Sequence, residues 1–250
     1  MSGAMSRAAQ MKLTLLNLFG SQMSSHGDAG NLLVLQRRCE WRGILVERLD
    51  FELGDNLAQC EGANLICGGG STESGLALVR DDFLRVAPLL RSLVEEGVAA
   101  LAVCTSFQLF GEYLETPEGE RLEGAGIFSS HTLLDAERQT GNIVIANSDF
   151  GELIGYENHT GKTFLHEDQE PFGRVLGGFG NNGTDGTEGA RYKNALGTYL
   201  HGPLLPKNPQ IADFLIATAL EQRYGEPIEL APLPDKWLKL AREAAKARPR

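Results

Sequence analysis

The chain has 250 residues, with 23 lysines and arginines against 33 aspartates and glutamates and a formal net charge of −10. This length fits one large α/β domain, or one domain with a small appendage, and the acidic balance argues against a nucleic-acid partner. No apolar run approaches the roughly 20 residues that span a membrane, so we expect no membrane insertion.

The cysteines are Cys39, Cys60, Cys67 and Cys104, and none belongs to a CxxC motif or to a metal-type pair with histidine. This spacing predicts neither a metal site nor a disulfide framework, and we expect no cofactor. Unpaired cysteines fit a reducing, cytoplasmic compartment.

Apolar patterns predict alternating strands and helices in the first half of the chain, after a loose leader at residues 1–10, with Met11 as the functional start. Strands are expected at residues 12–19, 44–49 and 63–67, and helices at residues 32–41 and 74–96. Pro88 should break or kink the second helix, because proline lacks a backbone N–H. The polar loop at residues 20–31 holds three glycines and is either shaped for a ligand or an ordinary mobile loop.

The strand at residues 63–67 runs into Gly68, Gly69, Gly70 and Ser71. A glycine-rich bend at the carboxyl end of a strand can direct backbone N–H groups into a site, as an oxyanion hole requires. The bend could also be only a tight turn. Its expected place beside the next strand of a parallel sheet favours the functional interpretation.

That next strand, residues 98–103, is a buried apolar run that stops at Cys104, and Thr105 and Ser106 follow as candidate helix caps. A nucleophile between a strand and a helix stands on an elbow, where the turn lifts the thiol clear of the sheet and the helix N-terminus favours the thiolate. Free cysteine is also among the most buried residue types. Cys104 is therefore either a nucleophile or a core residue.

Short strand candidates separated by turns dominate the second half and indicate antiparallel structure. They lie at residues 127–134, 142–146, 153–157, 162–165, 172–179, 191–193 and 195–200, and helices are expected at residues 209–224 and 237–246. We expect an α/β fold, with a doubly wound, mainly parallel sheet, a nucleophile elbow and an antiparallel elaboration. The expected domain covers residues 11–225, with a C-terminal helical extension at residues 226–250.

A cysteine nucleophile needs a base, which is usually histidine. His26 lies in the glycine-containing loop, and His131, His159 and His166 fall within or beside strand candidates, where they could be structural. His201 follows an apolar strand and precedes Gly-Pro, so its imidazole can emerge at a strand end. Position alone favours His201 as the base.

Three motifs together carry a family resemblance. They are AVCTSFQLFG around Cys104, GYENHTGKT at residues 155–163 and GTYLHGP at residues 197–203. In this order they resemble the class I glutamine amidotransferases, in the branch of the cobyric acid synthases, over residues 12–224. The resemblance implies that Cys104 attacks the glutamine side-chain amide, that His201 is the base, and that Gly69 and the Thr105 N–H hold the oxyanion.

One position departs from that family pattern, which places a glutamate two residues after the histidine. Pro203 occupies this place, so His201 lacks its expected orienting carboxylate. Either the site works as a Cys–His dyad or another acid substitutes, for which Asp28 is only a guess.

Within the family, the chain most resembles the GatD-type subunits of lipid II isoglutaminyl synthases. The resemblance rests on GDAGN at residues 27–31, the Asn- and Gly-rich loop before Ala195, and HGPLLPKNP at residues 201–209. It implies that Arg138 holds the carboxylate of the substrate L-glutamine, although Arg138 could also be a solvated surface charge. It further implies a separate MurT-type ligase partner in a heterodimer, because the only GKT, at residues 161–163, lacks the first glycine of a phosphate loop.

Three other functions stay open. The chain could supply ammonia to a cobyrinate-like or other amide ligase, or it could be a cysteine peptidase on a similar core. It could also be a catalytically idle partner-binding subunit, since the orienting glutamate is missing.

Overall fold

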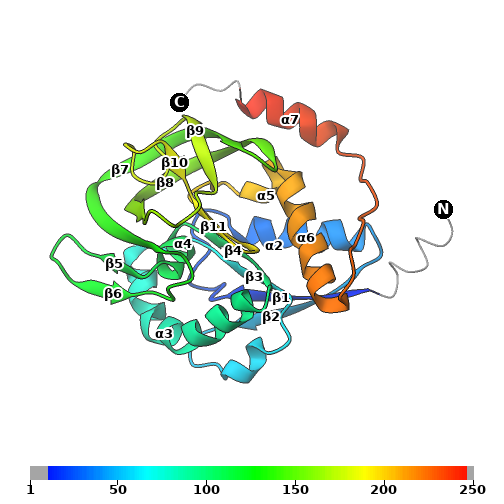
Figure 1. Cartoon of the computed structure of the whole chain (residues 1–250), viewed down its shortest axis with the longest axis horizontal. Coiled ribbons are helices and arrows are strands. Elements are labelled where there is room, and N and C mark those ends of the chain that lie inside the picture. The colour runs from blue at the N-terminus through cyan, green and yellow to red at the C-terminus, as the bar shows by residue number, and fades with distance from the viewer. Residues whose placement is uncertain (1–10, 247–250) are drawn as a thin grey trace.

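A mainly parallel sheet forms the centre of the molecule, and the computed structural model describes residues 11–246 of the chain (Figure 1). The expected leader at residues 1–10 therefore lies outside the described residues. The sheet has the order β11-β12-β4-β3-β1-β2, and only β11 runs antiparallel to its neighbour. Its strands are β1 (Lys12–Leu18), β2 (Leu45–Phe51), β3 (Leu65–Gly68), β4 (Ala99–Val103), β11 (Ala190–Tyr192) and β12 (Ala195–Thr198).

Helices cover both faces of this sheet. α2 (Ala29–Glu40) and α6 (Pro209–Tyr224) pack together on one side, and α3 (Glu73–Glu95) lies on the other (Figure 1). The connection from β1 to β2 through α2 runs toward one edge of the sheet, and the connection from β3 to β4 through α3 runs toward the other edge. Because both crossovers are right-handed, the two helices lie on opposite faces of the sheet. This confirms the expected doubly wound α/β class. Both faces of β4 are covered, and all five of its residues are buried.

α3 continues through Pro88 without interruption. The expectation that Pro88 breaks this helix is therefore wrong. Thr72 caps the helix by accepting a hydrogen bond from the Gly75 N–H at 3.2 Å. The buried face continues on both sides of the proline, through Phe83, Val86 and Leu90. Burial of this apolar face offsets the loss of one backbone hydrogen bond.

A second, largely antiparallel sheet follows the elbow helix α4 (Thr105–Phe110) and arches beside the central sheet (Figure 1). Its strands are β5 (Tyr113–Glu115), β6 (Arg121–Glu123), β7 (Ser130–Asn147), β8 (Gly151–Leu165), β9 (Gly173–Gly177) and β10 (Thr187–Glu188). The four short strands expected between residues 127 and 165 are in fact one long hairpin of β7 and β8. A register irregularity between Leu134 and Gln139 interrupts its alternation, which explains why the pattern suggested separate strands.

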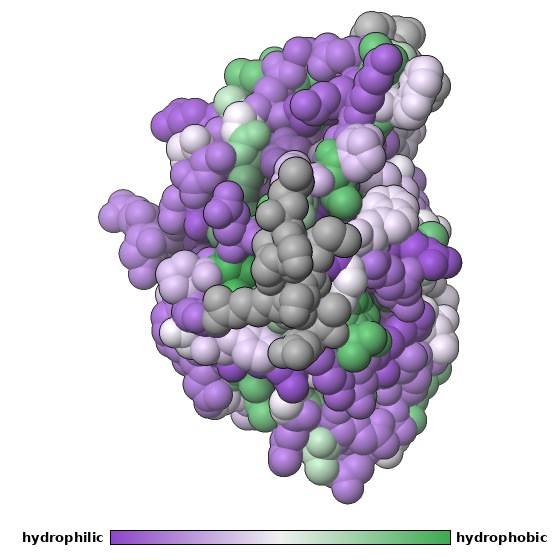
Figure 2. All heavy atoms as spheres, turned by 90° about the vertical axis from the view of Figure 1, so that its right-hand side faces the viewer, coloured by the Kyte–Doolittle hydropathy of each residue, from purple (hydrophilic) through white to green (hydrophobic). Residues whose placement is uncertain are grey.

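The C-terminal part of the described chain is an irregular segment followed by a final helix. The segment before α7 (Lys236–Lys246) is tied to the core by Arg38 of α2, which is 2.7 Å from Asp213 of α6 and 2.9 Å from Asp235. The remaining short helices are the 3₁₀ helix η1 (Leu57–Cys60) and α5 (Leu204–Lys207). No helix of the described chain is long and apolar enough to cross a membrane. On the face shown in Figure 2, hydrophilic residues predominate and hydrophobic ones form small scattered groups.

Candidate active site

Cys104 and His201 follow neighbouring carboxyl ends of the central sheet. β4 ends at Val103 and β12 at Thr198, and the strand register pairs these two residues. The Cys104 N–H extends the ladder by donating to the Thr198 carbonyl at 2.9 Å. Beyond β12, the His201 backbone exchanges two hydrogen bonds with Tyr156 of β8, which fixes where the imidazole emerges.

Cys104 has a backbone conformation that is uncommon for a residue with a side chain, with φ of 53° and ψ of −110°. It directly precedes α4, so the chain turns sharply between strand and helix. Thr105 and Ser106 do not cap this helix as expected, because their hydroxyls bind the glycine-rich bend. The Thr105 Oγ1 accepts from the Ser71 N–H at 2.9 Å, and the Ser106 Oγ donates to the Gly69 carbonyl at 2.8 Å.

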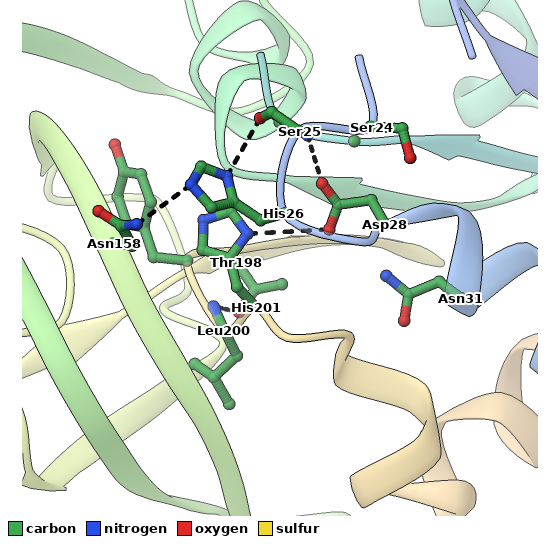
Figure 3. Close-up of polar contacts among 12 residues, drawn as sticks. Ser24, Ser25, His26, Asp28, Asn31, Asn158, Thr198, Leu200 and His201 are labelled. Atoms are coloured by element: carbon green, nitrogen blue, oxygen red, sulfur yellow. Dashed lines mark hydrogen bonds and ion pairs between the residues drawn. The ribbon is translucent and has the colours of Figure 1, made fainter. Parts of the chain in front are cut away.

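Asp28 is the acidic partner of His201 (Figure 3). Its Oδ1 lies 3.7 Å from the His201 Nδ1, and its Oδ2 accepts a hydrogen bond from the Gly70 N–H at 2.8 Å. Both side chains are buried, with 4% and 1% exposure. Pro203, which occupies the position of the family's glutamate, lies against Gly30 two residues after Asp28. The carboxylate thus reaches the imidazole from another loop.

Neither ring nitrogen of His201 makes a direct hydrogen bond within the described part of the chain. Burial lowers the pKa of this imidazole, but the nearby Cys104 sulfur and the Asp28 carboxylate outweigh burial and raise the pKa well above its usual range. The arrangement therefore favours an imidazolium next to the Cys104 sulfur. Such a pair is a nucleophile with its acid–base partner beside it.

The glycine-rich bend lies against these side chains without filling the space between them. A Cβ at Gly70 would stand 3.1 Å from the Cys104 Cβ and 3.3 Å from the His201 Cε1. A Cβ at Gly69 would stand 2.2 Å from the Met23 carbonyl oxygen. A side chain at Gly69 would therefore clash with backbone, and one at Gly70 would crowd Cys104 and His201.

A pocket of about 500 Å³, partly open to solvent, borders Cys104. The pocket brings together three residues singled out in the sequence, Cys104, Thr105 and Arg138. Its other lining residues include His26, Ser71, Gln108, Asn158 and His159. Gly69 does not line this pocket; it borders a neighbouring cavity of about 390 Å³ together with Asp28.

One chain of side-chain contacts spans the pocket. The Arg138 guanidinium on β7 donates to the Asn158 Oδ1 of β8 at 2.9 Å, and the Asn158 amide group lies 3.1 Å from the His26 Nε2. The His26 ring in turn packs on His201, with 4.7 Å between ring centroids (Figure 3). Arg138 thus lines the pocket and is held by Asn158, while its side chain remains solvent-exposed.

The sequence did not indicate most of the residues that surround Cys104 and His201. Asp28 was only a guess, because nothing in a linear pattern places a loop carboxylate beside a histidine from the far end of the chain. His26 lies two residues before it, within the same loop, and Asn158 and His159 belong to the GYENHTGKT motif. That motif was the available signal for a role of these residues in the site.

Comparison with known proteins identifies the class. The chain belongs to the family of CobB/CobQ-like glutamine amidotransferase domains, whose profile matches residues 12–209. It is therefore a glutamine amidotransferase. The elbow cysteine and the strand-end histidine described above fit this class. A solved glutamine amidotransferase is similar in fold, with a TM-score of 0.57 at 16% identity, over 82% of this chain and 98% of that one.

Two curated relatives that match most of the chain narrow the comparison to one kind of subunit. The chain is 37% identical over 218 residues to the GatD subunit of the glutamine-hydrolysing lipid II isoglutaminyl synthase of Staphylococcus aureus (strain N315), covering 87% of this chain and 88% of the relative. It is 36% identical over 226 residues to the corresponding GatD subunit of Streptococcus pneumoniae (strain ATCC BAA-255 / R6), covering 90% and 86%.

Proposed function

We propose that this chain is the glutaminase subunit of a lipid II isoglutaminyl synthase. It hydrolyses L-glutamine to glutamate and ammonia, and it supplies the ammonia to an ATP-dependent, MurT-type ligase that amidates the D-glutamate of the lipid II stem peptide. Family membership and the two GatD relatives, each matched over most of its length, support this assignment. The complex is a heterodimer that works in the cytoplasm in peptidoglycan synthesis.

The structural observation that carries the proposal is the strained elbow at Cys104 with His201 and Asp28 behind it. In the proposed first step, the Cys104 thiolate attacks the carbon of the glutamine γ-carboxamide. The His201 imidazolium then gives its proton to the nitrogen, and the C–N bond breaks to release ammonia. In the second step, neutral His201 takes a proton from water, and the hydroxide cleaves the γ-glutamyl thioester to glutamate and the thiol.

Asp28 replaces the family's glutamate as the carboxylate that orients His201. A carboxylate at the Nδ1 edge of an imidazole fixes the ring orientation and stabilises its protonated form. The Gly70 N–H holds the carboxylate from its other oxygen. The site therefore runs as a Cys–His–Asp triad rather than as a dyad.

The tetrahedral oxyanion is held by the N–H groups of Gly69 and Thr105. Thr105 opens α4, and the first N–H groups of a helix have no intrahelical acceptor. The Gly70 N–H already binds Asp28, and the family resemblance assigns the donor from the glycine-rich bend to Gly69. Preorganised donors of this kind act on charge that develops only in the transition state.

Arg138 receives the α-carboxylate of glutamine. Its guanidinium lines the same pocket as Cys104, and a planar fork of N–H donors matches a carboxylate. The Asn158 side chain holds Arg138 in place, so little side-chain ordering is needed on binding.

The test is glutamine hydrolysis and amide transfer by the chain in complex with its ligase. With L-glutamine labelled with ¹⁵N in the amide, the label should enter the isoglutamine amide of lipid II in an ATP-dependent reaction. Cys104→Ala should lose hydrolysis by at least roughly 10³-fold, as expected when a nucleophile is removed. Cys39→Ala, which removes a buried thiol on α2, should remain active.

Normal hydrolysis by Cys104→Ala would refute the mechanism. Hydrolysis without transfer of the label to lipid II, in a complex that amidates another acceptor, would refute the assigned pathway but keep the glutaminase.

A further inference from the structure

His159 of β8 is a buried histidine that the proposed mechanism does not use. Its ring stacks on Tyr199, with centroids 3.7 Å apart and planes at 8°, and it is 2% exposed. Its Nδ1 lies 2.7 Å from the Gly161 carbonyl oxygen. Because a carbonyl can only accept a hydrogen bond, Nδ1 carries the ring proton and donates.

The other ring nitrogen must then be an acceptor. Burial lowers the pKa of His159 to about 3, so the ring is neutral and Nε2 has a free lone pair. No donor reaches this Nε2 from the described residues. A buried acceptor without a donor is costly to keep, and its presence in a native site calls for a ligand, a water or another explanation.

The position of His159 indicates which ligand can supply the donor. His159 pairs with Gln139 across the β7–β8 hairpin, directly beside Arg138, and both His159 and Arg138 line the pocket that Cys104 borders. An α-amino acid carries its ammonium and carboxylate on one carbon, so a group that holds one must stand near a group that holds the other. Arg138 and His159 are such a pair, one a cationic donor and the other a neutral acceptor.

We propose that the Nε2 of His159 accepts a hydrogen bond from the α-ammonium group of the substrate, and so selects an α-amino acid over a simple γ-amide. This inference rests on the proposed glutaminase function and on the carboxylate role of Arg138. His159 acts as a specificity-determining residue, and the γ-carboxamide, two methylenes from the α-carbon, lies toward Cys104.

The experiment compares two substrates of the full-length chain in complex with its ligase. L-glutamine carries the α-ammonium, whereas glutaramate, the monoamide of glutaric acid, lacks only that group. His159→Phe removes the acceptor but keeps an aromatic ring against Tyr199. His131→Phe is the matched control, since His131 stacks between Tyr113 and Phe164 on the same hairpin and does not line the pocket.

We expect the unaltered protein to prefer glutamine over glutaramate by roughly 100-fold or more in kcat/KM. His159→Phe should lower kcat/KM for glutamine by about 30-fold, mainly through KM, and should change kcat/KM for glutaramate by less than about threefold. His131→Phe should leave the preference unchanged. If His159→Phe does not fold, His159→Gln, which keeps an acceptor oxygen, replaces it and should retain part of the preference.

Equal losses on both substrates, or an unaltered protein that hydrolyses both amides equally well, would overturn the inference and leave the glutaminase function in place. Absence of glutamine hydrolysis by the unaltered complex would instead refute the proposed function, and the role of His159 with it.

Discussion

Asp28 and His201 form a buried pair, 3.7 Å apart, between the loop that follows β1 and the segment that follows β12. No residue near His201 in sequence supplies this carboxylate, because Pro203 stands where the family's glutamate is expected. The first prediction concerns this pair. Asp28→Asn should lower kcat for glutamine hydrolysis by roughly 10²–10⁴-fold, because the amide cannot stabilise the imidazolium.

The pH profile separates this role from a structural one. Asp28 helps to raise the pKa of His201, so its removal should lower that pKa and shift the alkaline limb of kcat/KM to lower pH. Asp50→Asn is a suitable control, because Asp50 is an exposed residue of β2 that pairs with Arg48. An unchanged profile and rate in Asp28→Asn would mean that the site is a dyad.

The second prediction concerns the close approach of the glycine-rich bend. Gly70→Ala adds a methyl group 3.1 Å from the Cys104 Cβ and 3.3 Å from the His201 Cε1, so one of these side chains must shift by a few tenths of an ångström. We expect kcat to fall by roughly tenfold or more while the protein stays folded, because small misplacements of catalytic groups are costly.

Gly177→Ala is the matched control, since its Cβ would meet nothing within 4 Å. Steady-state kinetics and thermal unfolding of both variants provide the measurement. Full activity of Gly70→Ala would show that Cys104 and His201 tolerate displacement and need not act together.

The third prediction is a strain effect at Cys104. With φ at 53° and ψ at −110°, this residue occupies a region that favours glycine. Cys104→Gly and Cys104→Ala should both be inactive, but the glycine variant should be more stable by about 1–3 kcal/mol in urea unfolding. The reverse order is expected at Cys67 of β3, a regular strand position, where glycine should be less stable than alanine by roughly 0.5–1 kcal/mol. If the glycine and alanine variants had the same order of stability at Cys104 and at Cys67, the backbone at Cys104 would not be strained.

The fourth prediction concerns Glu188, which is fully buried behind β12 and accepts hydrogen bonds from the Tyr199 N–H at 2.6 Å and the Thr198 Oγ1 at 3.0 Å. Burial raises the pKa of Glu188 from 4.5 to about 8, against the opposing effect of the Tyr199 hydrogen bond. Between these two pH values the folded state binds more protons at this site than the unfolded state. Stability must therefore fall as pH rises through this window, by at most about 1.4 kcal/mol per pH unit.

Glu188→Gln keeps an acceptor for the Tyr199 N–H and removes the titration. We expect the free energy of unfolding of the unaltered protein to decline relative to this variant from pH 4.5 to about 8, as measured by urea unfolding at each pH. A constant difference across that range would show that the carboxyl group is ionised throughout.

The fifth prediction concerns Arg138. Arg138→Met should raise KM for glutamine by roughly 100-fold with a much smaller change in kcat, because a carboxylate anchor far from the reacting carbon contributes similar binding in the ground and transition states. Arg174→Met, an exposed change on β9, should have no effect on either constant. A loss confined to kcat would place Arg138 in the chemistry rather than in substrate binding.

Local patterns determined much of this fold in advance. The apolar run before Cys104 predicted β4, the alternation with helices predicted a doubly wound sheet, and the order of three motifs indicated the family. These features depend on neighbours within a few residues, where periodicity and turn chemistry act directly. The same local view erred at Pro88 and in the β7–β8 hairpin, because burial of a long face and pairing with a distant strand overrode the local signals.

The composition of the site was decided only by tertiary structure. Asp28 meets His201 because β1 and β12 belong to one parallel sheet whose strands deliver their following loops to the same edge. The acceptor state of His159 depends on Gly161 and Tyr199, and the orientation of Arg138 depends on Asn158 across a hairpin. The sequence shows that these side chains are present, but their interactions depend on distances of a few ångströms between residues that are far apart in the chain. Sequence spacing does not determine those distances.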